Sequence, residues 1–111
     1  MRGPRADLED WQSCLNLLPP RAEQPDPSIE YARGYCSLHM GKWPPAEEAF
    51  ALAASQPLGW YYLGLCRAAR GKPREAVRAF EREFRRNDLG LAERIHIACA
   101  ALQGARALTP A

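Results

Sequence analysis

Cysteine and histidine are the residues of this chain that could ligate a metal or act as nucleophiles. The four cysteines stand at positions 14, 36, 66 and 99, and the two histidines at 39 and 96. No C-x-x-C pair and no H-E-x-x-H motif occurs. We therefore expect no metal and no cofactor. The cysteines have two interpretations. They could form a disulfide or redox pair, or, as the favoured interpretation, serve as small buried hydrophobic residues on apolar helix faces in a reducing compartment.

The sequence also lacks the patterns of phosphate-binding or hydrolytic enzymes. Gly-Lys occurs at 41–42 and at 71–72, but a phosphate loop needs G-x-x-x-x-G-K-[ST] after a strand, and Pro73 follows Lys72. Gly41 and Gly71 are better interpreted as glycines that end helices. The histidines belong to no serine, cysteine or aspartate arrangement of the triad type. We expect the protein not to be an enzyme.

Arginines are the remaining residues that could recognise a ligand. They lie in a stretch that we expect to be helical. They would lie as a basic stripe and could bind nucleic acid or an acidic partner. Glutamates 75, 81 and 83 interleave with them, and Glu81 and Arg85 have the spacing of a helical ion pair. A solvent-exposed, salt-bridged face is therefore the favoured interpretation, and nucleic-acid binding the weaker one. The stripe comprises Arg74, Arg78, Arg82, Arg85 and Arg86.

Short helices must position these residues, because proline and glycine divide the chain at close intervals. No segment alternates apolar and polar residues with period two, so we expect an all-α domain of antiparallel helical hairpins over residues 1–111. We expect Asp88 to cap the last helix, Gly104 to end it, and residues 105–111 to form a flexible tail. The predicted helices cover about 6–18, 28–40, 44–56, 58–70, 73–86 and 89–102.

An internal repeat of about thirty residues links the two central hairpins. Gly34, Gly41, Lys42, Ala46 and Phe50 recur as Gly64, Gly71, Lys72, Ala76 and Phe80. A period of ~20–50 residues is typical of stacked structural repeats. We expect the glycines at 34 and 64 to let neighbouring helices approach closely. Ala76 would then face Gly64, while Trp60 and Phe80 would fill space between hairpins.

Residues 57–88 resemble one unit of the tetratricopeptide repeat family, and 27–56 resemble a degenerate copy with a shortened period. The ends, 6–19 and 89–104, are similar to half-units. The resemblance implies a short right-handed α-solenoid of about six helices. The residues that carry it are Gly34, Phe50, Trp60, Leu63, Gly64, Gly71, Ala76 and Phe80.

In this family the first helix of each hairpin lines a concave groove that holds a peptide or helix of a partner. The resemblance therefore implies an apolar, tyrosine-rich groove in this chain. The same side chains could instead pack against the N-terminal helix or the C-terminal tail. The implied positions are Tyr31, Tyr35, Leu38, His39, Leu58, Tyr61, Leu65, Ala68, Ile95, Cys99 and Leu102.

The favoured function is a non-enzymatic protein–protein interaction module, an adaptor or small chaperone that binds an apolar helix or peptide. The alternative is a self-associating, homo-oligomeric repeat protein, whose apolar ends would include Leu8, Trp11 and Ile97. No apolar run reaches the ~18–20 residues of a membrane span, and no export signal is visible, so we expect no membrane partner and a cytoplasmic location. The preference for arginine over lysine suggests a bacterial, GC-rich coding sequence.

Overall fold

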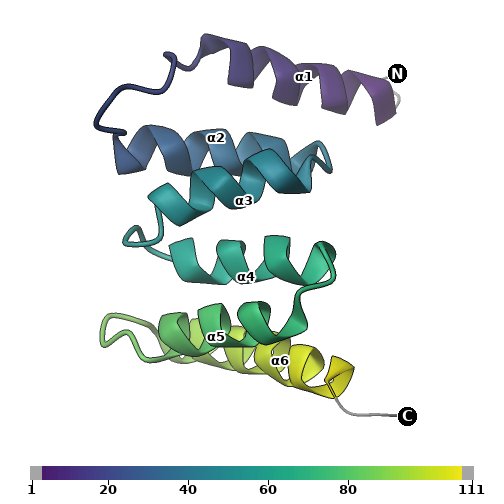
Figure 1. The fold of residues 1–111 in the computed structure, drawn as a ribbon, viewed down its shortest axis with the longest axis vertical. Helices are drawn as coiled ribbons and strands as arrows, with labels where there is room; N and C mark the ends of the chain where they lie inside the picture. Colours follow the sequence, from purple (N-terminus) through teal and green to yellow (C-terminus); the bar gives the residue numbers. More distant parts are fainter. Residues whose placement is uncertain (1–3, 109–111) are drawn as a thin grey trace.

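A computed structural model describes the backbone of residues 4–108 and the side chains of residues 10–108. This part of the chain contains helices and no strand, so the predicted all-α class is confirmed (Figure 1). None of its helices is long and apolar enough to cross a membrane. The helices are α1 (Pro4–Leu17), α2 (Pro27–His39), α3 (Trp43–Leu52), α4 (Gly59–Ala69), α5 (Pro73–Phe84) and α6 (Leu91–Ala107).

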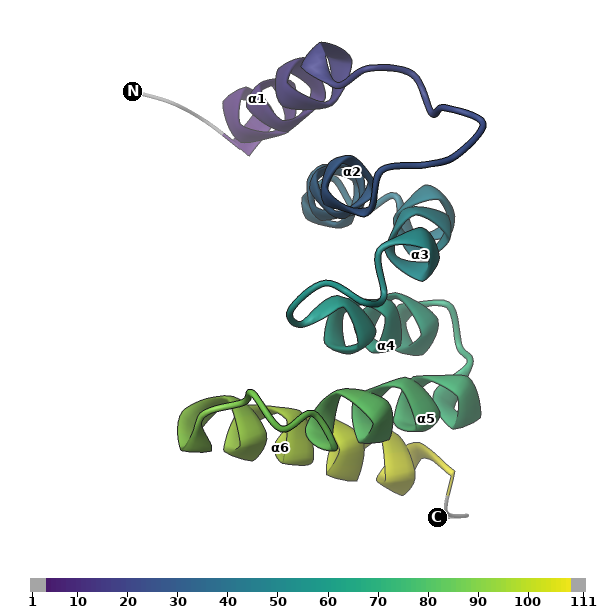
Figure 2. The ribbon, with the colours of Figure 1, turned by 90° about the vertical axis from the view of Figure 1, so that its left-hand side faces the viewer.

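The helices are stacked in chain order, and each helix packs on the next. Figure 1 shows them lying one below another across the long axis of a body that measures 40 × 34 × 25 Å. In the side view of Figure 2, α3 and α5 lie on one side of the stack, while α2, α4 and α6 lie towards the other. Neighbouring hairpins therefore present corresponding helices to the same side.

Local signals explain where the central helices begin and end. The Asp26 carboxylate accepts a hydrogen bond from the Ser28 amide at 2.9 Å and so caps α2. Proline stands in the first turn of α2, α3 and α5, where its missing N–H costs little. Gly41 and Gly71 have φ values of +72° and +74°, so the predicted helix-ending glycines are confirmed.

Glycine lies at the close contact within each central hairpin. A Cβ atom on Gly34 would lie 2.9 Å from the ring of Phe50, and one on Gly64 would lie 2.5 Å from the ring of Phe80. The expectation of close approach at residues 34 and 64 is therefore confirmed. The side chain that lies nearest to Gly64 from α5 is the Phe80 ring.

Two apolar clusters form the core around these contacts. The first contains Phe50 and Leu63 with small neighbours from α3 and α4. The second contains Ala76 and Phe80 of α5 with Ile97 of α6. Because Phe80 touches Gly64 on one side and belongs to the cluster with Ile97 on the other, it links α4, α5 and α6.

The C-terminal helix differs from the sequence prediction at both ends. Gly104 lies inside α6, which continues to Ala107, so the predicted end and the predicted tail over 105–107 are wrong. A Cβ on Gly104 would lie 2.9 Å from Val77, which shows that this glycine permits close packing on α5. Gly90, not Asp88, occupies the cap position of α6. Residues 109–111 of the predicted tail lie outside the described residues.

The cysteines are all free thiols, but only Cys36 and Cys66 are buried. Cys14 and Cys99 are exposed, so the expectation that all four pack as core residues is wrong for these two. Burial raises the pKa of the Cys66 thiol to about 12, which keeps it neutral and unreactive at physiological pH.

Candidate partner-binding site

An open pocket lies between α4 and the first turns of α6. Its volume is about 430 Å³, and its walls combine aliphatic, aromatic and polar side chains. The Tyr61 hydroxyl lies 2.6 Å from Nε2 of His96, so a hydrogen bond joins the two walls. We call this the α4–α6 pocket. Its lining residues are Leu58, Tyr61, Tyr62, Leu65, Ala92, Glu93 and His96.

Tyr62 connects this pocket to an aromatic network that runs through the stack. Its ring lies 5.2 Å from that of Phe50, 5.7 Å from Tyr35 and 5.9 Å from Tyr31. Tyr61 lies 5.3 Å from Tyr62, so the network reaches the pocket. Burial raises the pKa of Tyr31 to about 12 and also raises the pKa values of Tyr61 and Tyr62. These hydroxyls therefore stay protonated and can donate hydrogen bonds.

The N-terminal helix covers the part of the predicted groove that α2 contributes. Trp11 of α1 stacks on His39 with ring centres 4.5 Å apart, and it meets Tyr35 edge-on at 5.7 Å. Leu38 and Tyr31 are half-buried against the first core cluster. For Tyr35 and His39, the structure thus shows the alternative in which groove side chains pack against the N-terminal helix. The Leu8 side chain lies outside the described residues.

The structure brings three of the predicted groove residues together, namely Leu58, Tyr61 and Leu65. Ala68 is exposed on α4 and does not line the pocket. The predicted α6 positions also lie elsewhere. Ile95 and Leu102 are 55% and 56% exposed, and neither these two nor Cys99 lines the pocket.

Four lining residues lie outside the groove predicted from the sequence, namely Tyr62, Ala92, Glu93 and His96. Ala92 and His96 stand one helical turn apart, and Glu93 adjoins them, so their spacing was the available signal. The rotation of α6 turns Ile97 into the core and Ala92 towards α4, so the α6 positions predicted from the sequence do not line this pocket.

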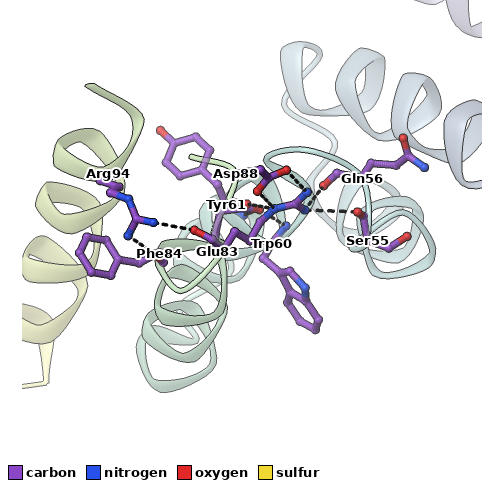
Figure 3. Close-up of polar contacts among 9 residues, drawn as sticks. Ser55, Gln56, Trp60, Tyr61, Glu83, Phe84, Asp88 and Arg94 are labelled. Carbon is purple, nitrogen blue, oxygen red and sulfur yellow. Dashed lines mark hydrogen bonds and ion pairs between the residues drawn. The ribbon is translucent and has the colours of Figure 1, made fainter. Parts of the chain in front are cut away.

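A buried carboxylate sets the position of α4 and therefore of Tyr61. The cap position of α4 is Leu58, which has a left-handed backbone with φ 63° and makes no side-chain cap. Glu83 of α5 replaces that cap, since its Oε1 accepts from the amides of Trp60 at 3.0 Å and Tyr61 at 3.4 Å (Figure 3). Negative charge at a helix N-terminus is favourable, because the free N–H groups point towards it.

Arg86 joins this carboxylate to the loop between α3 and α4. Its Nη1 donates to the carbonyl oxygens of Ser55 at 3.2 Å and Gln56 at 3.1 Å. Its Nε lies 3.3 Å from Oε2 of Glu83, and its Nη2 lies 2.9 Å from Asp88. Asp88, which was expected to cap α6, is instead paired with Arg86.

Arg94 extends the same network to α6. It donates to the backbone oxygens of Phe84 at 3.1 Å and Arg86 at 2.8 Å (Figure 3). Both walls of the α4–α6 pocket are therefore held to the end of α5. We call Glu83, Arg86, Asp88 and Arg94 the α5 clamp.

The Glu83 carboxyl should make stability depend on pH. Burial raises its pKa, and the charge of Arg86 and the backbone amides offset this only in part. The native state then keeps a proton that the unfolded chain has released. The free energy of unfolding should therefore fall as pH rises from the ordinary carboxyl pKa through the raised pKa of Glu83.

This dependence can be isolated by urea unfolding of the wild type and Glu83→Gln across that pH range. The difference in unfolding free energy, wild type minus variant, should decline as pH rises. An increase in this difference with rising pH would mean that Arg86 lowers the pKa of Glu83 below its ordinary value.

The arginine stripe differs from its sequence prediction. Within the described residues, Glu81 and Arg85 form no ion pair, and Arg74, Arg78 and Arg82 form none either. The salt-bridged face expected from the sequence is therefore wrong for these arginines. The Arg82 guanidinium instead lies 4.4 Å above the ring of Trp60. Trp60 is thus half-buried under Arg82 rather than fully enclosed between hairpins.

Comparison of the chain with family models, with curated proteins and with solved structures gave no match. Among the described side chains, no three cysteine, histidine, aspartate or glutamate residues are grouped so that they could hold a metal ion.

Proposed function

We propose that this protein is a tetratricopeptide-like helical repeat protein that binds a segment of another protein. The α4–α6 pocket is the observation that carries the proposal. It is an open hollow whose wall from Leu58 to Leu65 is aliphatic and aromatic, while Glu93 and His96 supply polar groups opposite. Binding sites typically combine mostly apolar walls with a few placed polar groups.

The repeat assignment rests on two equivalent contacts. Gly34 with Phe50 and Gly64 with Phe80 are the same pair of residue types at the same spacing, in consecutive hairpins. Packing of each helix on the next supports a stack built by repetition. A right-handed solenoid is the arrangement that we propose for it.

The pocket suits a few side chains of a partner better than a whole enclosed ligand. Its ~430 Å³ is open and lies near the lower end of the ~300–1,000 Å³ usual for ligand pockets. An apolar residue of a helix or extended peptide can enter between Leu58 and Leu65. Tyr61 and His96 can then form hydrogen bonds with the backbone of the partner segment or with a polar side chain beside the apolar residue.

The proposed role is that of a non-enzymatic adaptor or small chaperone. We place it in a reducing compartment such as the cytoplasm, in keeping with cysteines that are free thiols. Tyrosine is a common residue at binding hot spots, because it is rigid and presents both an apolar ring and a hydroxyl.

Blocking the pocket from its rim should weaken partner capture without unfolding the protein. Ala92 is exposed and lines the pocket, so Ala92→Arg should fill the entrance while leaving the core intact. We expect it to weaken binding by about 10-fold or more, equal to ~1.4 kcal/mol. The measurement is quantitative affinity capture from the native host, followed by titration of each captured protein.

The matched control is Ala51→Arg, which adds the same side chain at an exposed site on α3 outside the pocket. It should bind like the wild type. Equal capture by the Ala92→Arg and wild-type proteins, at equal melting temperature, would refute the assignment of the pocket as the binding site.

A further inference from the structure

A second apolar surface lies at the C-terminal end of the stack, on the far side of α5 and α6 from α4. In Figure 1 these two helices form the lower end of the molecule, beyond which no further described helix packs. A hollow of about 580 Å³ runs between them. We call it the end groove. Its lining residues are Val77, Glu81, Phe84, Arg85, Ala98, Ala101, Leu102 and Ala105.

The apolar surface of the end groove continues along the exposed face of α6. Leu91 is 75% exposed, Ile95 55% and Leu102 56%, and Phe84 on the α5 side is 40% exposed. Large exposed apolar side chains that adjoin one another mark interaction sites more often than scattered ones do. The opposite face of α6, with Ile97, is already buried against the stack.

Five exposed apolar residues on one face of α6 have the spacing of a helix-packing seam. Successive members are four, three, four and three positions apart, which is the heptad pattern with which one helix packs along another. This spacing indicates a helical partner that lies along α6. The members are Leu91, Ile95, Ala98, Leu102 and Ala105.

Positive charge flanks this groove on α5, where Arg85 lines it and two further arginines share the side of the helix that carries Arg85. Arg74, Arg78 and Arg85 are exposed, and none forms an ion pair with any described residue. They fall on one side of α5, at spacings of four and seven residues. Glu81 is the one acidic residue that lines the groove.

We propose that the end groove binds an amphipathic helix of a partner protein that carries acidic residues along one flank of its apolar seam. The apolar seam supplies the contact area, and the arginine row fixes the orientation and selects the acidic flank. This surface is separate from the α4–α6 pocket, so the protein would hold two segments at once.

Charge argues against a second copy of this chain as the occupant. Two-fold pairing brings the same surface of each copy together. The arginine row of one copy would then lie near that of the other, and like charges brought together oppose association. An acidic helix has no such conflict.

Two synthetic 18-residue helical peptides test the proposal. Both carry leucine at heptad seam positions, and one has glutamate along a single flank where the other has lysine. Fluorescence anisotropy titrations should show the glutamate peptide binding about 10-fold or more tightly than the lysine peptide. Arg78→Glu/Arg85→Glu should reverse this preference, and Leu102→Glu should weaken binding of the glutamate peptide.

Ala92→Arg, which blocks the α4–α6 pocket, should leave binding of the glutamate peptide unchanged. The proposal for the end groove can therefore fail or hold independently of the proposal for the α4–α6 pocket. Equal affinity for both peptides, or an unchanged preference in Arg78→Glu/Arg85→Glu, would overturn the proposal. So would tighter binding of mixed-sequence single-stranded DNA than of the glutamate peptide at physiological salt. Light scattering tests for self-association. A dimer that Leu102→Glu dissociates would also overturn the proposal, because it would assign the end groove to a second copy of this chain.

Discussion

Arg86→Ala should lower the free energy of unfolding by about 3–5 kcal/mol, the cost typical of removing one partner from a buried ion pair. The Glu83 side chain is fully buried, and Arg86 lies 3.3 Å from its Oε2, which makes no hydrogen bond. At a pH above the raised pKa of Glu83, where this carboxylate is charged, truncation would leave it without its cation. It would also remove the donors to Ser55 and Gln56. Urea unfolding followed by circular dichroism measures the loss.

Arg85→Ala is the matched control, because Arg85 adjoins Arg86 but is exposed and forms no ion pair with a described residue. It should change the unfolding free energy by less than about 0.5 kcal/mol. Glu83→Gln should restore part of the stability lost in Arg86→Ala, since the buried charge is then absent. A loss below about 1 kcal/mol in Arg86→Ala would show that the α5 clamp is not a major source of stability.

Phe80→Ala should cost about 3–5 kcal/mol, as truncation of a buried phenylalanine usually does. The Phe80 side chain is 2% exposed and lies against Gly64 of α4 and Ile97 of α6. Its removal would open a cavity where three helices meet. With a total stability of ~5–15 kcal/mol for a domain, such a loss should be visible as a large fall in melting temperature.

Phe84 provides the comparison, since it has the same side chain on the same helix and is 40% exposed. Phe84→Ala should cost less than about 1 kcal/mol, because much of its ring already contacts water. Similar losses in the Phe80 and Phe84 variants would mean that the core does not centre on Phe80.

Helix positions could be predicted because their signals are local. Asp26 with Pro27 begins α2, and Gly41 and Gly71 end helices through positive φ. Each of these effects involves residues within one turn, so a single sequence carries them. The same reasoning failed at Gly104, where glycine serves close packing on Val77 rather than helix termination.

The site was less predictable, because its residues depend on contacts between helices. Glu83 caps α4 from more than twenty positions away, and no local pattern marks it as the partner of the Trp60 and Tyr61 amides. The rotation of α6 is likewise set by burial of Ile97 in the second cluster. Ile95 and Leu102, which the half-unit resemblance assigns to the groove, therefore do not line the α4–α6 pocket.

Stability and binding are linked in this arrangement through the end of α5. The α5 clamp holds the first turn of α4, which carries Tyr61, and Arg94 ties α6 to the same point. Damage to the clamp should therefore loosen the α4–α6 pocket as well as destabilise the fold. The end groove lies on the other side of α5, so the helix binding that we propose there should not depend on the α5 clamp.

The central claim is that glycine at position 64 lets the Phe80 ring hold α4 against α5, and a double-mutant cycle tests it most directly. Gly64→Ala should destabilise the wild type by about 1–3 kcal/mol, because its Cβ would lie 2.5 Å from the Phe80 ring. In a Phe80→Leu background the same change should cost at least about 0.5 kcal/mol less. If Gly64→Ala costs the same in both backgrounds, or stabilises the wild type as helix propensity alone would, the claim is contradicted.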